Sequence, residues 1–328
     1  MMFALPLASA AVLRSSGTRR RCLRTLLALV TAAGCSLAVA QRGTTVDMPP
    51  GAPDAPRGFL WDAQKGGSRV MLMGTIHLGR DGQTTLPAGH AALLRGSAAL
   101  VLEADVFDAQ RVQAAMQRHA LRAPSTSGLD RTLPAPLRAR VQQRIESAGL
   151  APEVAWRFKP WALANNLVVL EAMRGGLSPA YSTEAQLVAV ARSAGLPVLE
   201  LESVEAQLAL FDAMPDGLAL AYLEEVVGGI ERGESQREIA DLVEAWRAGD
   251  DAAMARQVDR MRAAVKPVDR WVSSQLIESR HPAMLDRIER MAASGRLHLV
   301  AVGTLHFFGP EGLLAGLRAR GYRITRLP

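Results

Sequence analysis

One four-residue motif occurs twice in the sequence, and each copy ends in a histidine. Residues 74–77 (Gly-Thr-Ile-His) follow the apolar run 70–73, and residues 303–306 (Gly-Thr-Leu-His) follow the apolar run 299–302. A histidine on a rigid element can be a metal ligand or a general base, although either could also be a structural residue at a strand end. Glycine lets the backbone turn or approach a neighbour without a Cβ clash. The candidate histidines and their supporting residues are His77, His306, Gly74, Thr75, Gly303 and Thr304.

A third apolar run, residues 100–102, ends in carboxylates. Glu103 and Asp105 follow it, and the two-residue period of a strand places them on the same side of the chain. A buried carboxylate needs a cation, a metal or hydrogen-bond donors. Two histidines and a carboxylate are a common ligand set for a divalent ion with an open water position. Alternatively, Asp105 caps the helix that follows and Glu103 is a surface charge.

Strands are expected at both ends of the chain, with helices between them. A hairpin is predicted near residues 59–73, and buried strands at 98–103 and 297–302, with a last strand at 322–327. This order predicts an α/β (α+β) fold: one mixed sheet built from residues 58–105 and 296–328, carrying a mostly helical insertion at 106–295. A short strand at 197–201 interrupts the insertion. Helices are predicted at 108–119, 136–148, 160–173, 183–194, 216–230, 236–248, 250–264, 270–293 and 311–320.

If the three buried strands are neighbours, both histidines and Glu103 emerge at one edge of the sheet, where open α/β folds bind their ligands. The sequence therefore predicts that His77, Glu103 and His306 line one pocket.

The first forty residues are typical of an export signal. They hold five arginines and no acid, then the apolar run 26–30, then Ala-Val-Ala at 38–40. We expect cleavage near Gln41, a linker at 41–57 and a domain at 58–328. The product would be periplasmic or secreted, without a membrane span after cleavage; an uncleaved anchor is the alternative.

Two variants of the export route are also considered. Residues 18–24 resemble a twin-arginine signal, and residues 32–35 resemble a lipoprotein box less closely. Both cysteines, Cys22 and Cys35, lie in this segment, so cleavage would leave no thiol for a disulfide, a nucleophile or a metal site.

Charge and composition argue against nucleic acid as a partner. The chain has a formal charge of +6, but outside residues 1–40 it holds 33 basic and 32 acidic residues. Only 5% of residues are aromatic, too few to indicate a stacking platform for bases. A near-neutral body lacks the basic footprint that binds phosphate backbones.

The motifs together resemble the TraB/PrgY/GumN family, which includes the Tiki proteins, and the bacterial GumN-like branch most of all. The resemblance covers about residues 58–328 and rests on VMLMGTIHLG, LVLEAD, LELESVEAQLAL, VAVGTLHFFGPEGLLAGLRARGYRITRL and the segments at 159–162 and 181–184. It implies a compact α/β fold related to erythromycin-esterase-like and haem-binding ChaN-like proteins. It also implies metal-dependent proteolysis, with manganese or cobalt favoured, at His77, His306 and Glu103.

The resemblance adds further candidates and two departures. The family arginine corresponds to Arg280, which is followed by His281 where asparagine is usual, so the hydrogen bond expected there is in doubt. Ser182 and Glu184 depart from the pattern Tyr-Gly-x-Asp, although the carboxylate is kept.

Several of these residues have structural alternatives. Glu184 could be catalytic or could cap a helix, and Arg280 could bind a carboxylate or lie on a solvated helix face. Glu202 and Glu205 follow a strand, so either could face the site. The other histidines are interpreted as structural, with the last facing outward: His90, His119 and His298.

The sequence thus predicts an exported metal-dependent hydrolase, most consistent with a peptidase acting on a peptide or small molecule. Manganese, cobalt or zinc would be held by His77, His306 and Glu103 and would lower the pKa of bound water. Glu103 or Glu184 would act as base, and Arg280 would stabilise an oxyanion or anchor a carboxylate. The alternative is a non-catalytic ligand- or metal-binding envelope protein associated with polysaccharide export.

Overall fold

The computed structural model of the chain describes residues 57–328. The predicted signal peptide and nearly all of the predicted linker lie outside the described residues. Within that part of the chain, no helix combines the length and the apolar character that a membrane crossing requires.

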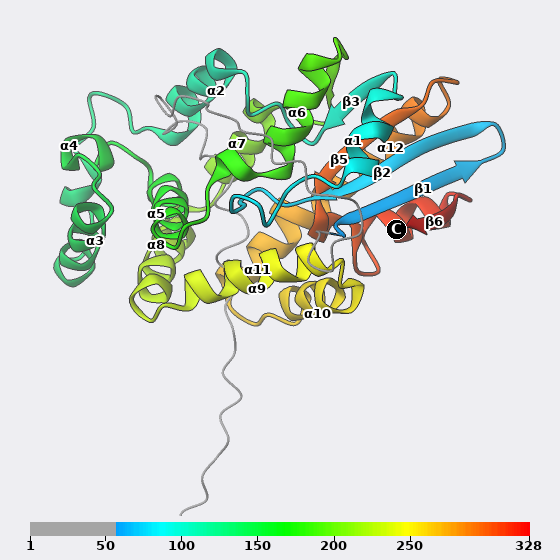
Figure 1. The fold of residues 1–328 in the computed structure, drawn as a ribbon. Coiled ribbons are helices and arrows are strands. Elements are labelled where there is room, and N and C mark those ends of the chain that lie inside the picture. The colour runs from blue at the N-terminus through cyan, green and yellow to red at the C-terminus, as the bar shows by residue number, and fades with distance from the viewer. Residues whose placement is uncertain (1–56) are drawn as a thin grey trace, which may run out of the picture.

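The described residues form one six-stranded mixed sheet in the order β4-β3-β5-β2-β1-β6 (Figure 1). β1 pairs antiparallel with β2 and β6, whereas β2, β5, β3 and β4 run parallel to one another. The predicted α/β fold with a mixed sheet is confirmed. The strands are β1 (Phe59–Lys65), β2 (Ser68–Thr75), β3 (Ala99–Leu102), β4 (Val198–Glu200), β5 (His298–Gly303) and β6 (Arg323–Leu327).

The three central strands are buried because they are parallel and covered on both faces. Every residue of β3 and β5 is buried, as are the last six of β2. Thr75 pairs with Gly303 across β2 and β5, and Leu102 pairs with Ala301 across β3 and β5. The three strands therefore end at one edge, and the segments that follow them leave the sheet side by side.

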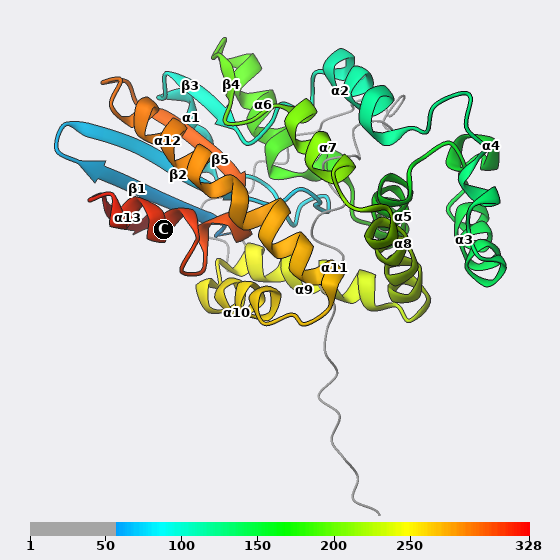
Figure 2. The same cartoon turned by 180° about the vertical axis from the view of Figure 1, so that it is seen from behind.

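Helices cover the sheet and extend beyond that edge. α1, α6, α12 and α13 contact the strands, and α5 and α8 pack against each other away from the sheet (Figures 1 and 2). One continuous apolar core runs through both parts. The helices are α1 (Ala88–Arg95), α2 (Ala109–Ala115), α3 (Ala135–Ser147), α4 (Pro152–Ala155), α5 (Pro160–Arg174), α6 (Thr183–Ser193), α7 (Val204–Asp212), α8 (Asp216–Glu231), α9 (Glu234–Ala248), α10 (Asp251–Arg262), α11 (Pro267–Trp271), α12 (His281–Ala292) and α13 (Leu313–Ala319).

The single long helix predicted at 270–293 is wrong. The chain instead forms α11, a π-helical turn η5 (Val272–Ile277), a 3₁₀ turn η6 (Glu278–Arg280) and α12. Pro282 lies in the first turn of α12. Its ring would clash with the carbonyl of residue 278 in a continuous helix, and it has no N–H to donate. Arg280 is the last residue of this break and lies immediately before α12.

Other expectations for individual elements also need correction. The helix predicted at 108–119 ends in a second π-helical turn, η2 (Met116–Ala120), and it is Asp108 that caps it, through the backbone N–H groups of Gln110 and Arg111. Helices α1, α4 and α7 were not predicted. His298 was expected to face outward, but it is buried because β5 is covered on both faces.

Candidate functional site

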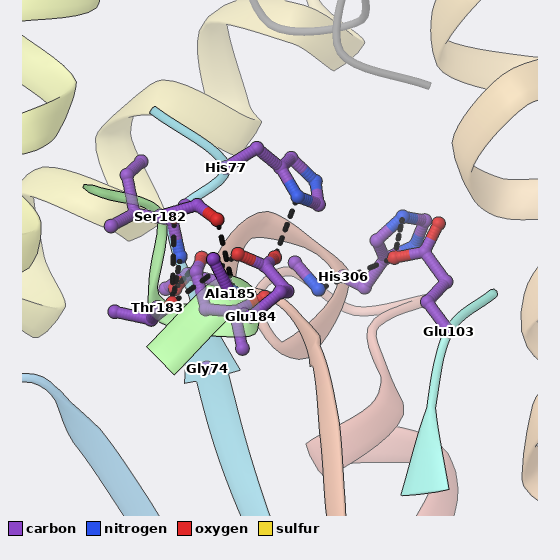
Figure 3. Close-up of polar contacts among 12 residues, drawn as sticks. Gly74, His77, Glu103, Ser182, Thr183, Glu184, Ala185 and His306 are labelled. Atoms are coloured by element: carbon purple, nitrogen blue, oxygen red, sulfur yellow. Dashed lines mark hydrogen bonds and ion pairs between the residues drawn. The ribbon is translucent and has the colours of Figure 1, made fainter. Parts of the chain in front are cut away.

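His77, Glu103 and His306 converge around the Cα of Gly303, at the edge where β2, β3 and β5 end. A Cβ built on Gly303 would lie 3.2 Å from His77 Nε2, 3.5 Å from Glu103 Oε2 and 3.6 Å from His306 Cδ2. We call this space the Gly303 cradle. Figure 3 shows Glu103 beside His306, with His77 approaching from the end of another strand. The predicted convergence of the two motifs is therefore found in the structure.

The glycine and threonine of the motifs hold the two copies together. The Thr304 hydroxyl donates to the Thr75 carbonyl at 2.8 Å, and the indole Nε1 of Trp246 donates to the Gly74 carbonyl at 2.9 Å. A Cβ on Gly74 would lie only 2.8 Å from Thr304 Oγ1. Gly74 is thus required by the close approach of the two motifs, whereas Gly303 leaves room at the site itself.

Helix α6 provides the partner of His77. Glu184 Oε1 lies 2.6 Å from His77 Nδ1 (Figure 3). The Thr183 hydroxyl accepts a 2.9 Å hydrogen bond from the backbone N–H of Ile76, so the first turn of α6 is tied to the residue before the histidine. The helix is capped by Ser182, which accepts from the Ala185 N–H at 3.1 Å. Glu184 is therefore not the cap; it holds the imidazole.

The electrostatics of this pair favour the charged forms. Burial acts to lower the pKa of His77, but the carboxylates of Glu184 and Glu103 outweigh it and raise that pKa to about 9. Burial alone would raise the pKa of Glu184, but His77 beside it lowers the pKa instead. Since Nδ1 of His77 contacts Glu184, Nε2 is the nitrogen that faces the Gly303 cradle.

Arg280 fixes Glu103 from the opposite side. Its Nη2 contacts Glu103 Oε1 and lies 2.5 Å from Glu202 Oε2, while its Nη1 donates to the Leu276 carbonyl at 3.0 Å. Gln207 of α7 also donates to Glu103 Oε1, at 2.8 Å. Burial acts to raise the pKa of Glu103, but the guanidinium of Arg280 outweighs it and holds that pKa far below its usual range. Arg280 is buried, so the solvated-face alternative is wrong.

A chain of hydrogen bonds fixes the protonation of His306. His281 Nδ1 lies 2.6 Å from the Glu311 carbonyl, and His281 Nε2 lies 3.0 Å from His306 Nδ1. Only a protonated Nδ1 can donate to a carbonyl, and burial lowers the pKa of His281, so its Nε2 is an acceptor. His306 must therefore donate through Nδ1. Its unprotonated Nε2 faces Arg280 Nη1 at 3.4 Å and Glu103 Oε2 at 3.8 Å.

Two predicted residues do not join this cluster. Asp105 accepts a hydrogen bond from the Phe107 backbone N–H at 3.0 Å and so stabilises a local turn before α2. Of the two glutamates after β4, Glu202 faces the site, whereas Glu205 contacts His119 at 2.7 Å on another side of α7.

Two site residues were missed by the sequence analysis. Gln207 would have been found only by recognising that Ser203 caps a helix, since its hydroxyl accepts from the Ala206 N–H. In the sequence His281 is only a departure from the family's asparagine, but the structure shows that it supplies a hydrogen bond to His306.

The donor atoms around the Gly303 cradle fit a divalent ion in their type. They belong to the imidazoles of His77 and His306 and the carboxylate of Glu103, and Nδ1 of each imidazole is held by a neighbour, as is usual for metal-binding histidines. His77 is cationic without a metal, so it would have to release its Nε2 proton on binding one. Their spacing is open: within residues 57–328, no three histidine, cysteine or acidic side chains form a group that could hold a metal ion. His77 and Glu103 would have to approach each other across the cradle.

Comparison with known proteins agrees with these motifs. The family model for the TraB/PrgY/gumN family matches residues 59–326. The chain is 26% identical to "Uncharacterized protein YbaP" of Escherichia coli (strain K12) over 264 residues, which cover 77% of this chain and 89% of YbaP. The same protein of Shigella flexneri is 26% identical over 258 residues, covering 75% and 87%. No solved structure matches. The chain is thus a member of the TraB/PrgY/gumN family.

Proposed function

We propose that the protein is an exported, metal-dependent hydrolase of the peptidase type. The observation that carries this proposal is the convergence of His77, Glu103 and His306 on the Gly303 cradle, with the second nitrogen of each histidine held by a neighbour. These residue types are the usual ligands of a catalytic divalent ion.

A manganese, cobalt or zinc ion held by His77, Glu103 and His306 would supply a water of lowered pKa. The chain's own groups prepare the site for it. Glu184 fixes the ring of His77 so that Nε2 faces the cradle. Arg280 and Gln207 occupy Glu103 Oε1, which leaves Oε2 as the oxygen that faces the cradle.

We assign Arg280 a positioning role. Its nitrogens already contact Glu103, Glu202 and the Leu276 carbonyl, so an oxyanion or a substrate carboxylate would have to displace one of these partners. Substrate would reach the cradle past His77, whose side chain is 34% exposed, whereas those of Glu103 and His306 are buried.

Elemental analysis and peptide cleavage test the proposal together. The mature protein, loaded in turn with manganese, cobalt and zinc, is expected to hold about one ion per chain and to cleave members of a broad peptide library. His77→Ala should lose both properties. His298→Ala is the matched control, because His298 is a buried histidine at the other end of the strand that leads to His306. An ion content far below one per chain would contradict the metal site.

The same experiment separates the alternative function. A stoichiometric ion with no cleavage of any library member would favour a non-catalytic metal- or ligand-binding protein of the cell envelope. The export part of the proposal has its own measurement: mass spectrometry of the processed chain should find an N-terminus at or near Gln41. A chain that starts at a lipidated Cys35 would contradict plain cleavage.

A further inference from the structure

A second pocket lies outside the site described above, where α5 and α8 begin and α7 ends. Its volume is about 260 Å³. We call it the α5 pocket. The residues of its lining that matter here are Arg122, Lys159, Trp161, Asp212, Met214 and Asp216.

The pocket is built on the segment Lys159-Pro160-Trp161, which the sequence analysis singled out and the hydrolytic site does not use. The Lys159 backbone N–H donates to the Ala120 carbonyl at 2.8 Å, next to a bridge between Leu121 and Phe158. Pro160 begins α5, where a missing N–H costs nothing. The start of the helix is therefore firmly held against the segment that follows α2.

Trp161 carries a polar group without a partner. Its side chain is 2% exposed and is stacked on Phe211, with ring centroids 5.1 Å apart and planes inclined by 18°. Its indole Nε1 has no hydrogen-bond acceptor among the described residues. The Nε1 atom has almost no accessible surface, so what Trp161 presents to the α5 pocket is the apolar part of its ring.

The charges of the pocket are balanced and partly preorganised. Asp212 is held by Lys159 through Oδ1 and by His119 through Oδ2, the latter at 3.2 Å from His119 Nδ1. His119 belongs to the π-helical turn η2, a local irregularity that is frequent at functional sites. At the rim, Arg122 supplies a further cation and the exposed Asp216 a further carboxylate.

We propose that the α5 pocket binds a small zwitterion, an amino acid or a dipeptide. Two cations, Arg122 and Lys159, can take a carboxylate, and Asp216 can take an ammonium group. A simple anion would meet two carboxylates and a simple cation two basic groups, so a ligand with both charges is the best match. The volume is just below the range of sites for drug-sized molecules, and Trp161 and Met214 offer an apolar surface for a side chain.

This site stands on the α5 pocket alone and does not depend on hydrolysis at the Gly303 cradle. Helix α7 connects the α5 pocket with the residues around the Gly303 cradle. Gln207 of α7 donates to Glu103, whereas one turn further on Asp212 lines the α5 pocket and Phe211 stacks on Trp161.

Calorimetric titration of the mature protein tests the proposal with leucine and glycyl-leucine as probes. N-acetyl-leucine lacks the ammonium group and leucinamide lacks the carboxylate. Each is expected to bind at least about tenfold more weakly than leucine, which is the cost of losing one charge-assisted hydrogen bond. Asp216→Asn should weaken the binding of leucine but leave the binding of N-acetyl-leucine unchanged. Arg122→Gln should weaken the binding of leucine but leave the binding of leucinamide unchanged. Arg138→Gln, an exposed change on α3, is the control.

A second measurement reports on Trp161 directly. Its indole ¹H–¹⁵N signal, assigned by its loss in Trp161→Phe, should shift when leucine is added, because the Trp161 ring lines the pocket. Trp161→Phe keeps a ring that can stack on Phe211 but removes the N–H donor together with part of the ring surface. Absence of binding by leucine and glycyl-leucine would overturn the proposal. The proposal would also be overturned if leucine bound but its affinity did not change when its ends were blocked or when Asp216 and Arg122 were substituted.

Discussion

The two Gly-Thr-x-His motifs are nearly identical in sequence and opposite in electrostatics. His77 is partly exposed and paired with a carboxylate, and its pKa is raised to about 9. His306 is buried, donates to another imidazole and faces the guanidinium of Arg280, and its pKa is lowered well below the ordinary value, with burial as the main cause. The motif presents each imidazole at the end of a strand, but it does not determine the pKa or the protonation state of the ring.

The difference comes from the helical insertion. Helix α6 places Glu184 on the first motif, whereas the broken helix before α12 places Arg280 and His281 on the second. The same backbone element therefore yields a cationic imidazole on one side of the Gly303 cradle and a neutral one on the other. A repeated motif is thus weak evidence for repeated chemistry, and the partners from the insertion decide each role.

The largest expected effect is the loss of Arg280, which would break the second half of this comparison. Arg280→Met keeps most of the side-chain volume but leaves the buried Glu103 and the partly buried Glu202 without their cation. Removing one partner of a buried ion pair typically costs about 3–5 kcal/mol. Urea unfolding should show this loss, and Arg290→Met on the exposed face of α12 should cost less than about 0.5 kcal/mol. A loss of less than about 1 kcal/mol would mean that the carboxylates find other partners.

The two motif glycines should respond in opposite ways to the same substitution. In Gly74→Ala the new Cβ would lie 2.8 Å from Thr304 Oγ1 and 2.9 Å from Phe59 Cβ, so the fold should lose about 1–3 kcal/mol. In Gly303→Ala the nearest atom is His77 Nε2 at 3.2 Å, and the backbone angles suit alanine. That variant should unfold near the wild-type urea concentration but fail to bind manganese. Equal loss of stability in both variants would contradict this division.

The sequence predicted the part of the site that strands deliver. Three apolar runs, each followed within four residues by a histidine or a glutamate, were enough to predict that His77, Glu103 and His306 leave one edge of the sheet. This worked because parallel strands buried on both faces are recognisable as continuous apolar runs. The same rule would have placed His298 correctly, since a strand between two parallel neighbours has no outward face.

The partners of these residues could not be predicted, because tertiary contacts decide them. Nothing local in the sequence says that Gln207 reaches Glu103 across 104 positions, or that His281 meets His306. The break before Arg280 is different: Pro282 was a visible signal that one helix could not continue through it. Predicting that break would have separated α12 from the residues that precede it.

A pH titration sharpens the comparison without altering the fold. In a chelator-treated sample, ring NMR signals should show His77 titrating near pH 9, whereas His306 should stay neutral even below its ordinary pKa of 6.5. Because the folded pKa of His77 lies above the unfolded value, its contribution to stability is full below pH 6.5 and is lost as the pH rises through about 9.

Removal of the carboxylate partner should erase most of this difference. Glu184→Gln leaves a neutral amide next to His77 Nδ1, so the pKa of His77 should fall from about 9 toward 6.5. Glu153→Gln, an exposed change on α4, should leave it unchanged. If His77 still titrates near 9 in Glu184→Gln, then Glu184 is not what separates the two histidines.

The smallest effect concerns the tautomer of His306 and isolates the role of His281. His281→Asn can preserve both hydrogen bonds, because the amide N–H can donate to the Glu311 carbonyl and the amide oxygen can accept from His306 Nδ1. His281→Leu has a similar size and offers neither, so it should cost about 1–3 kcal/mol by leaving two buried groups unsatisfied, and asparagine should recover most of it. The decisive measurement is the ¹⁵N shift of the His306 ring. Wild type and His281→Asn should carry the proton on Nδ1, whereas His281→Leu should shift it toward Nε2, where Glu103 Oε2 is the nearest acceptor. A His306 ring that keeps its proton on Nδ1 in His281→Leu would show that Arg280, which donates toward Nε2, is sufficient to fix the tautomer.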